Sequence, residues 1–537
     1  MDKRRTDALT VYRIMAVAPF GGRSGGLRSG VDAACGTGGI EEAMTAVAPS
    51  VDVLLPREYC PSGRIVLQPE SFDDFLPERI VKKIPYLEAL CNALGLVRRA
   101  GKDGTDVDQM REKVTALLPG LELDFSVLEE SAPASKTPPS TAASSAIDDL
   151  FSLVDVPESD DTPGAVPRHD AFRGLRVQLE ATLRQVMQRL LRSSEFRKIE
   201  SSWRGAALML CGSAVQEQPH KVVFTLVTSE DDALSGLLQE LRELPAEKLP
   251  NMLLLDTMLQ NTPSGLDLLE QVLETADMLM IPVALYAGPD FFGLDEWREI
   301  SRLSYLPNYL EDAYFARWRR LRDHPGGTWT AVLLNRLPAR KLFDGGDGAV
   351  CGTAFHEKEQ PWITPVWALG ALTAKCVRST AWPLHLDRMQ RFFLESMTLR
   401  DDEAVPVETL FSEERIEQFT RAGFTPLASP LRSDTVFLPG MVSIKGKSLE
   451  FNLFFSMLLG FLFRLKERIE AGECKGGTGD IADALKDFLV RGGDEPPDDL
   501  EVSFGNRDDK GVPVLSVGFT PPGPLLPSGR VDFTLGW

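Results

Sequence analysis

Short apolar runs alternate with helix-like segments in the middle of the chain. The runs lie at residues 221–227, 252–255, 280–287 and 330–334. Each run has the length of a buried strand, and the segments between them space their apolar residues as helices do. Continuous apolar strands that alternate with helices are typical of a mostly parallel sheet with both faces covered. The pattern therefore predicts an α/β domain with a large mixed sheet.

Amphipathic and alternating patterns extend this domain on both sides. Apolar residues from 175 to 191 recur with the period of a helix, which predicts a packing helix of about five turns. After the sheet, helices are expected at 449–471 and 481–490, and strands at 500–504, 513–519 and 531–535. The apolar and polar residues of these last strands alternate, which favours an antiparallel layer at the end of the chain.

The first part of the chain predicts a second, smaller α/β unit. Strands are expected at 10–20 and 64–67, and helices at 78–84, 86–100 and 107–118. The stretch from 21 to 39 is rich in glycine, and no regular element is expected there. The fold class is therefore α/β, with α+β character in part.

A polar linker separates the two units. Residues 129–145 read EESAPASKTPPSTAASS, which offers too little apolar surface to offset the entropy lost on folding. A short amphipathic helix is expected next, and its apolar face consists of Ile147, Leu150, Phe151 and Val154. We therefore expect a small domain at 1–128, a flexible linker with a short helix at 129–170, and a large domain at 171–537.

Composition and charge exclude some classes of protein. The chain has 537 residues, of which 43% are hydrophobic and 25% charged, so two or three folded domains are expected. The formal net charge of -20 argues against nucleic-acid binding, because phosphate recognition needs Lys and Arg gathered on one face. The most apolar segment, at 451–463, is shorter than the roughly 20 residues of a bilayer span. No membrane insertion is expected.

The cysteines and histidines do not form a recognisable ligand pattern. The 7 cysteines are scattered and never spaced as CxxC, so neither a zinc site nor a disulfide framework is expected. The 5 histidines lie far apart and form no HExxH or similar pair. No export signal is recognised near the first residue, so the bacterial cytoplasm is the expected location.

Three segments are similar to catalytic or cofactor-binding motifs. The segment VDAACGTGGIEEAM at 31–44 is similar to the first motif of S-adenosylmethionine-dependent methyltransferases, although no buried strand is expected before it. Ser24 lies in a GxSxG pattern, without a helix or histidine placed to support a nucleophile. The segment 440–448 has one residue too many between its glycines for a Walker loop, so a helix-entry turn is favoured.

One run in the first unit resembles the small (TssB-like) contractile-sheath subunit of bacterial type VI secretion. This run, PESFDDFLPERIVKKIPYLEAL, spans residues 69–90. The small subunit carries a Phe-Asp-Asp-Phe turn that leads into helices, and Phe72 and Phe75 match it. The strand expected at 10–20 takes the place of that subunit's opening strand.

Several runs in the second unit resemble the large (TssC-like) sheath subunit. The first is LLRSSEFRKIESSWRGA at 190–206, and AGPDFFGLDEW, YFARWRRLRD and LLNRLPARKLF follow in the order of the family. Aromatic residues and glycines in these runs are expected to bury ring surface and to form turns, as parts of a scaffold. The matching positions are Glu200, Trp203, Arg204, Gly205, Gly288, Pro289, Phe291, Phe292, Gly293 and Trp318.

The resemblance implies a structural protein that fuses the small and large subunits. Such a protomer would form a helical homo-oligomer around an inner tube of hexamers, attach to a baseplate and expel the tube by contraction. No catalytic, cofactor-binding or metal-binding residue is then expected. An AAA+ ATPase dismantles the family's contracted sheath by gripping a helix of the large subunit, and the helix with Ile147, Leu150, Phe151 and Val154 takes that place. Two alternatives stay open: a non-contractile cap or adaptor of the same machine, and a methyltransferase-like enzyme.

Overall fold

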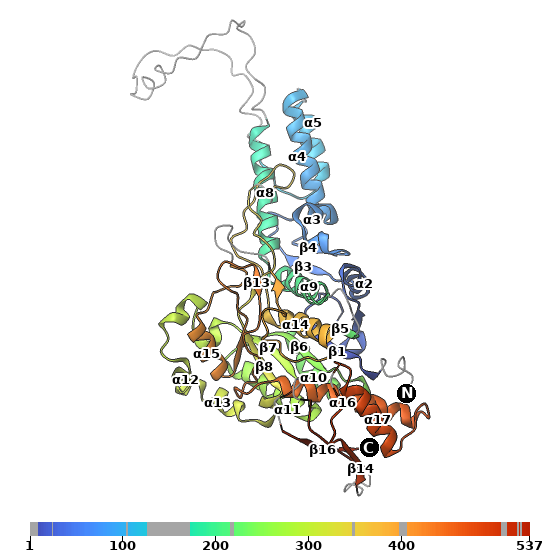
Figure 1. The fold of residues 1–537 in the computed structure, drawn as a ribbon. Coiled ribbons are helices and arrows are strands. Elements are labelled where there is room, and N and C mark those ends of the chain that lie inside the picture. Colours follow the sequence, from blue (N-terminus) through green and yellow to red (C-terminus); the bar gives the residue numbers. More distant parts are fainter. Residues whose placement is uncertain are drawn as a thin grey trace, which may run out of the picture.

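The computed structural model contains helices and strands in a mixed α/β arrangement, which confirms the expected fold class (Figure 1). It describes residues 9–537 except 24, 104–105, 126–171, 215–219, 346–348, 397–404, 494, 506–512, 523–525 and 527–528. The linker and the short amphipathic helix expected at 147–154 therefore lie outside the described residues.

A seven-stranded sheet forms the centre of the molecule, with strand order β12-β8-β7-β6-β1-β5-β2. Every neighbouring pair is parallel except β2 with β5. The strands are β1 (Tyr12–Ala18), β2 (Val31–Ala33), β5 (Val222–Thr228), β6 (Met252–Leu259), β7 (Val283–Ala287), β8 (Thr330–Leu334) and β12 (Phe424–Pro426). The four apolar runs are thus confirmed as parallel strands.

The first strand of the chain lies inside this sheet. β1 pairs with β5 along its whole length, from Tyr12 opposite Val222 to Ala18 opposite Thr228. Its other side pairs with β6. All of its residues except Arg13 are buried, as expected for a strand with both faces covered. The N-terminal segment and the segment after 172 therefore build one sheet together.

Helices cover both faces of the sheet and create two buried clusters. One face carries residues such as Ile14, Leu226 and Leu254, and the other carries Met15, Val227 and Leu255. The first face packs under α9 (Ser194–Gly212), α14 (Pro365–Thr380) and α16 (Glu450–Glu470). The second packs under α10 (Leu234–Arg242), α11 (Pro263–Leu279), α13 (Ala316–Arg322) and α15 (Glu413–Arg421).

Three long helices lie side by side and project away from the sheet (Figure 1). They are α4 (Pro85–Asp103), α5 (Val107–Leu117) and α8 (Arg173–Arg192). At their base lie α3 (Pro77–Lys83) and the hairpin of β3 (Val51–Leu54) and β4 (Arg64–Leu67). The helices expected from periodicity in this part are confirmed within a few residues.

The glycine-rich stretch is ordered, so the expectation of no regular structure there is wrong. It forms the 3-10 helix η1 (Gly26–Ser29), strand β2 and helix α2 (Thr37–Val47). β2 pairs antiparallel with β5 and ends that edge of the sheet. Gly36 precedes α2 with φ of 92°, a conformation that glycine adopts without strain. The glycines therefore serve tight turns between short elements.

The end of the chain forms the expected helices and antiparallel layer. Helix α17 (Thr478–Leu489) follows α16, and a three-stranded antiparallel sheet has the order β14-β15-β16. Its strands are Glu501–Gly505, Val514–Phe519 and Val531–Gly536. Among the described helices, none is both long and apolar enough to traverse a bilayer.

The remaining elements are short. The small strands are β9 (Leu337–Pro338), β10 (Trp362–Ile363), β11 (Leu394–Glu395) and β13 (Thr435–Val436), and α12 spans Leu306–Tyr309. The 3-10 helices are η2 (Phe72–Phe75), η4 (Asp231–Ala233), η5 (Ala246–Lys248), η6 (Pro289–Phe292), η7 (Trp297–Arg302), η8 (Ala313–Phe315) and η9 (Pro325–Thr328).

Candidate functional site

Helix α9 carries the Glu-x-x-Trp-Arg-Gly motif and packs it against the sheet. The helix begins after Ser193, whose hydroxyl accepts the N–H of Phe196 at 3.1 Å, a capping arrangement that satisfies one free donor of the first turn. Trp203 is fully buried, and its indole N–H donates to the carbonyl of Phe20 at 3.0 Å. Phe20 follows β1, so the hydrogen bond from Trp203 connects α9 to the N-terminal segment.

Gly205 allows α9 and α14 to cross closely. A Cβ at this position would overlap the indole ring of Trp367 on α14. The indole N–H of Trp367 in turn donates to a carboxylate oxygen of Asp256 at 3.0 Å. Any larger side chain at 205 would push the two helices apart, because a packed interior does not absorb such an overlap.

Four charged residues form what we call the charged junction: the buried Glu200, Arg340 and Glu357, and the partly exposed Arg204. Glu200 accepts Arg204 Nε at 2.8 Å and Arg340 Nε at 2.8 Å. Arg340 also donates to Glu357, with an Nη2 to Oε1 distance of 3.0 Å. Burial by itself lowers the pKa of Arg340, but Glu357 and Glu200 raise that pKa above its ordinary value. Two acids and two bases thus neutralise one another in a largely buried site.

The charged junction brings together residues from both resembling motif groups. The guanidinium of Arg204 stacks over the ring of Phe72, 4.9 Å from its centroid. Phe75 is fully buried, with its ring centroid 5.9 Å from that of Phe196 on α9. These two pairs are 132 and 121 positions apart in the chain, so the sequence shows them only as separate motifs, whereas the fold places them in contact. The Phe-Asp-Asp-Phe turn and the Glu-x-x-Trp-Arg-Gly helix therefore form one interface.

Asp74 holds the Phe-Asp-Asp-Phe turn in shape. One of its carboxylate oxygens accepts the backbone N–H groups of Glu70 and Ser71 at 2.9 and 3.0 Å, and Lys83 lies 3.4 Å away. Burial raises the pKa of Asp74, but these hydrogen bonds and Lys83 outweigh that effect and lower it below the ordinary value. The ionised carboxylate therefore stabilises the turn that presents Phe72 and Phe75.

An aromatic cluster occupies the opposite face of the sheet. It consists of Phe291, Phe292, Trp297, Phe315, Trp318, Phe419 and Phe424. Trp318 stacks on Phe424 with centroids 5.2 Å apart, and Phe291 meets Trp318 edge-on at 5.1 Å. Gly288 and Pro289 begin the turn that holds these phenylalanines, and Gly293 ends it with φ of 70°. The cluster is a hydrophobic core with directed ring contacts.

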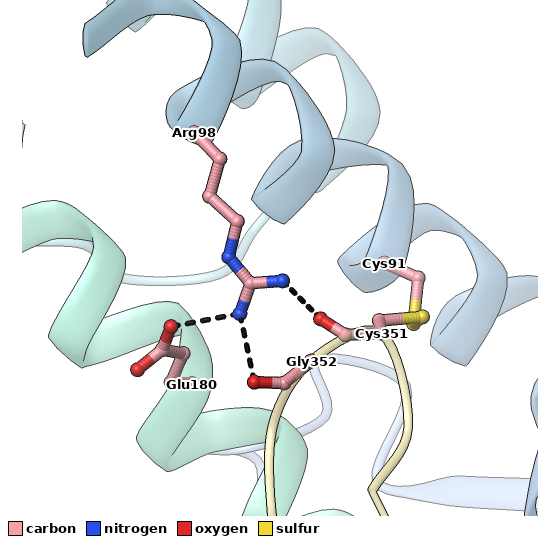
Figure 2. Close-up of a disulfide and its surroundings, with 5 residues drawn as sticks. All are labelled: Cys91, Arg98, Glu180, Cys351 and Gly352. Carbon is pink, nitrogen blue, oxygen red and sulfur yellow. Dashed lines mark hydrogen bonds and ion pairs between the residues drawn. A yellow bond between two sulfur atoms is a disulfide. The ribbon is translucent and has the colours of Figure 1, made fainter.

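A disulfide joins the projecting helices to a loop of the sheet region (Figure 2). Cys91 on α4 is bonded to Cys351, with 5.7 Å between the Cα atoms. Arg98, two turns further along α4, donates to the carbonyl of Cys351, to that of Gly352 at 3.2 Å and to Glu180 on α8 at 2.8 Å. The expectation that the cysteines form no disulfide is therefore wrong. The pair is 260 residues apart, and only the fold brings it together.

Part of the chain is similar to known sheath proteins. Residues 250–445 match the family described as EvpB/VC_A0108, tail sheath N-terminal domain. Residues 250–445 are therefore similar to a tail sheath domain. It is also 19% identical, over 314 residues, to the type VI secretion system sheath protein TssC1 of Pseudomonas aeruginosa. That match covers 52% of the chain and 62% of the relative, so the chain spans less than two thirds of that protein's length.

One solved structure is similar at a level that carries no argument about the fold. It belongs to the anti-feeding prophage baseplate, with a TM-score of 0.34 and 12% identity. The similarity covers 62% of this chain and 80% of the other.

The matched region contains some of the candidate residues and excludes others. The whole aromatic cluster lies within residues 250–445, as do Arg340 and Glu357. Helix α9, with Glu200 and Arg204, lies before the matched residues, and so does the Phe72–Phe75 turn. The charged junction therefore links residues inside the match to parts of the chain outside it.

Two of the segments similar to catalytic or cofactor-binding motifs lie in the described part of the chain, and neither has the structure that its motif requires. Residues 31–44 contain β2, which is an antiparallel edge strand of three residues and not a central parallel strand. The loop before α16 is closed by a bridge between Val442 and Ser448, as expected for a helix-entry turn. Ser24 lies outside the described residues.

One group of potential metal ligands in the described residues could not be recognised from the sequence. The side chains of His385, Asp387 and Glu450 offer ligand atoms within 4.8 Å of one another. The backbone N–H of His385 donates to Glu450 at 2.7 Å, which accounts for the approach of these residues. Glu450 is 65 positions from His385, so spacing could not reveal the group. Acidic groups gather in this way without an ion, and no site is assigned.

Proposed function

We propose that the chain is a structural protomer of a contractile, tail-like sheath of a type VI secretion system. It polymerises helically around an inner tube and drives the tube outward by contraction. The match of residues 250–445 to a tail sheath domain supports this proposal. In such a polymer, contact between copies supplies the work, and no reaction centre is needed.

We further propose that the N-terminal segment takes the place of the small sheath subunit. Its support is the position of β1 between β5 and β6, and the packing of Phe75 against Phe196. A segment that supplies a central strand cannot be removed without exposing two strand edges. Fusion in one chain fixes a one-to-one ratio of the two parts and raises their effective concentration.

The proposed partners follow from the same function. They are further copies of the chain, the hexamers of the inner tube and the baseplate. A AAA+ disassembly ATPase would bind the segment that contains Ile147, Leu150, Phe151 and Val154. The chain would act in the bacterial cytoplasm, without inserting into a membrane or binding nucleic acid.

Electron microscopy and light scattering of the purified full chain test assembly. Tubes or stacked rings that form as the concentration rises are expected. Folded particles of constant monomer mass at every concentration, with and without added tube protein, would contradict the proposal and favour a non-contractile cap or adaptor. Titration calorimetry with S-adenosylmethionine tests the methyltransferase alternative, for which we expect no heat of binding.

A further inference from the structure

Arg464 is a buried arginine that joins α16 to the beginning of β1. Arg464 is 6% exposed to solvent. Its Nε donates to the carbonyl of Leu9 at 3.0 Å, and its Nη2 donates to that of Val11 at 3.2 Å. These two bonds engage two of the three guanidinium nitrogens. They are made to neutral carbonyls, so they leave the positive charge without a counter-charge.

The third nitrogen, Nη1, is buried and has no hydrogen-bond partner. Within the described ranges, no carboxylate lies at ion-pair distance from Arg464. Burial, and then the positive charges of Arg13 and Arg491, lower the pKa of Arg464 to about 9. Buried charges in proteins are normally paired, because an unpaired charge loses the favourable interaction with water. This arginine therefore lacks a partner of opposite charge.

Arg464 lines a cavity of about 460 Å³ that has further positive charges. Arg13 and Lys248 belong to its lining, and both also line a neighbouring cavity of about 780 Å³. The carboxylates of Glu467 and Glu473 lie at the exposed rim, and Arg468 already binds Glu473 at 2.9 Å. Glu247 is half-buried, and its backbone carbonyl accepts a hydrogen bond from Arg13 at 2.9 Å. The buried base of the cavity is therefore positive in a chain whose net charge is -20.

We propose that this cavity binds an oxyanion, a phosphoryl or carboxylate group, which Arg13 and Lys248 contact directly and which supplies the counter-charge that the buried guanidinium of Arg464 lacks. Charge-assisted hydrogen bonds from guanidinium to such oxygens are short and strong. The bound group would neutralise the arginine and fasten together β1, the segment before β6 and α16. Its source is either a free anion or a carboxylate of a second copy, because the chain is rich in acidic residues. The site does not depend on sheath assembly.

Titration calorimetry of the full chain with inorganic phosphate and pyrophosphate tests the proposal at constant ionic strength. For a free anion we expect saturable binding and a raised melting temperature. Lys248→Gln, on the exposed rim, should weaken the affinity roughly tenfold, as loss of one charge-assisted hydrogen bond does. Lys82→Gln on α3 removes the same charge far from the cavity and should leave binding unchanged. Arg464→Met removes the buried positive charge and should weaken binding further, in a variant whose cooperative melting shows that it is folded.

The second source gives a different result. If a carboxylate of another copy fills the cavity, light scattering will show self-association that Lys248→Gln and added pyrophosphate weaken, and that Lys82→Gln does not. Absence of anion binding up to about 10 mM, a concentration that reveals even weak sites, together with self-association unaffected by Lys248→Gln, would overturn the proposal. Anion binding by a chain that forms no tubes would support this site and count against the sheath, so the two proposals fail separately.

Discussion

The aromatic cluster and the charged junction lie on opposite faces of one sheet and are stabilised in different ways. The cluster is built from rings at 291–318 and 419–424, whose contacts are non-polar and tolerate small shifts. The charged junction joins Glu200 and Arg204 to Arg340 and Glu357, which must meet with hydrogen-bonding geometry. An incomplete set of buried charges is costly, so the junction selects one arrangement of the segments it joins. We infer that the cluster provides stability and the junction provides specificity.

Removal of Arg340 should have the largest effect. In Arg340→Met, Glu357 loses its cation while Glu200 keeps Arg204, so one buried carboxylate is left unpaired. We expect a loss of about 5 kcal/mol in the free energy of unfolding, the upper end for breaking a buried pair. Urea unfolding followed by circular dichroism measures it.

A second variant separates specificity from stability at the junction. Arg340→Met combined with Glu357→Leu removes both partners and leaves the pair of Glu200 and Arg204 intact. This double variant should be more stable than Arg340→Met alone, because no unpaired carboxylate remains at 357. If the double variant is instead less stable by the sum of two single losses, the junction contributes ordinary pairwise stability and the comparison fails.

Truncation in the aromatic cluster should come next. Trp318→Ala removes a fully buried indole that stacks on Phe424, and we expect a loss of about 4 kcal/mol in the free energy of unfolding. Tyr314→Ala is the matched control, because that ring is 54% exposed on the neighbouring turn, and its loss should be about 1 kcal/mol or less. Equal losses at the two positions would show that the cluster is not the stabilising core.

The sequence predicted those helices and strands whose pattern of buried and exposed faces leaves a clear apolar pattern. The strands of the parallel sheet are continuous apolar runs because both faces are covered, and α8 shows a helical period because one face is wet. Helix α14 was missed because nearly all of its residues are buried, so no polar stripe marks its period. The short β2 and α2 were hidden by glycines that also suit loops.

The site was less predictable, because it depends on contacts between distant segments. The Glu200 and Trp203 motif could be recognised in the sequence, but Arg340 lies 140 positions from Glu200. The Cys91 to Cys351 pair spans 260 positions, and scattered cysteines give no spacing to read. The charge of Arg464 is unusual only because the fold buries it. Such features follow from the assembled fold and not from local patterns.

Breaking the disulfide tests another link between the N-terminal helices and the later part of the chain, the bond from Cys91 on α4 to Cys351. Reduction of Cys91 to Cys351 should lower the free energy of unfolding by about 3 kcal/mol, because the bond closes a long loop in the unfolded chain. Cys91→Ser with Cys351→Ser should match the reduced protein and no longer respond to a reductant. Cys211→Ser, at an exposed free cysteine, is the control and should behave as the parent chain. If the urea midpoint of the parent chain is the same with and without the reductant, the disulfide does not stabilise the fold as expected.

The smallest expected effect concerns Asp256, a residue of β6 that contacts Ser202 on α9 and Trp367 on α14. Asp256 lies where the pairing of β6 with β7 is interrupted, and it accepts hydrogen bonds from Thr364 and Trp367 at 2.6 and 3.0 Å. Burial raises its pKa, and these bonds only partly oppose that effect. The folded chain then holds the proton more tightly than the unfolded chain does, so ionisation lowers stability as the pH rises from about 4 towards the folded pKa.

Asp256→Asn removes this titration and keeps a similar shape. The free energy of unfolding of the variant, relative to the parent chain, should therefore rise with pH across that window, by on the order of 1 kcal/mol, and then level off. Any constant cost of the amide cancels in this difference, because only the slope is compared. Urea unfolding between pH 4 and about 8 supplies the two curves. Parallel curves would mean that Asp256 is as well solvated as an exposed carboxylate, and the junction face would then be less dry than the aromatic face.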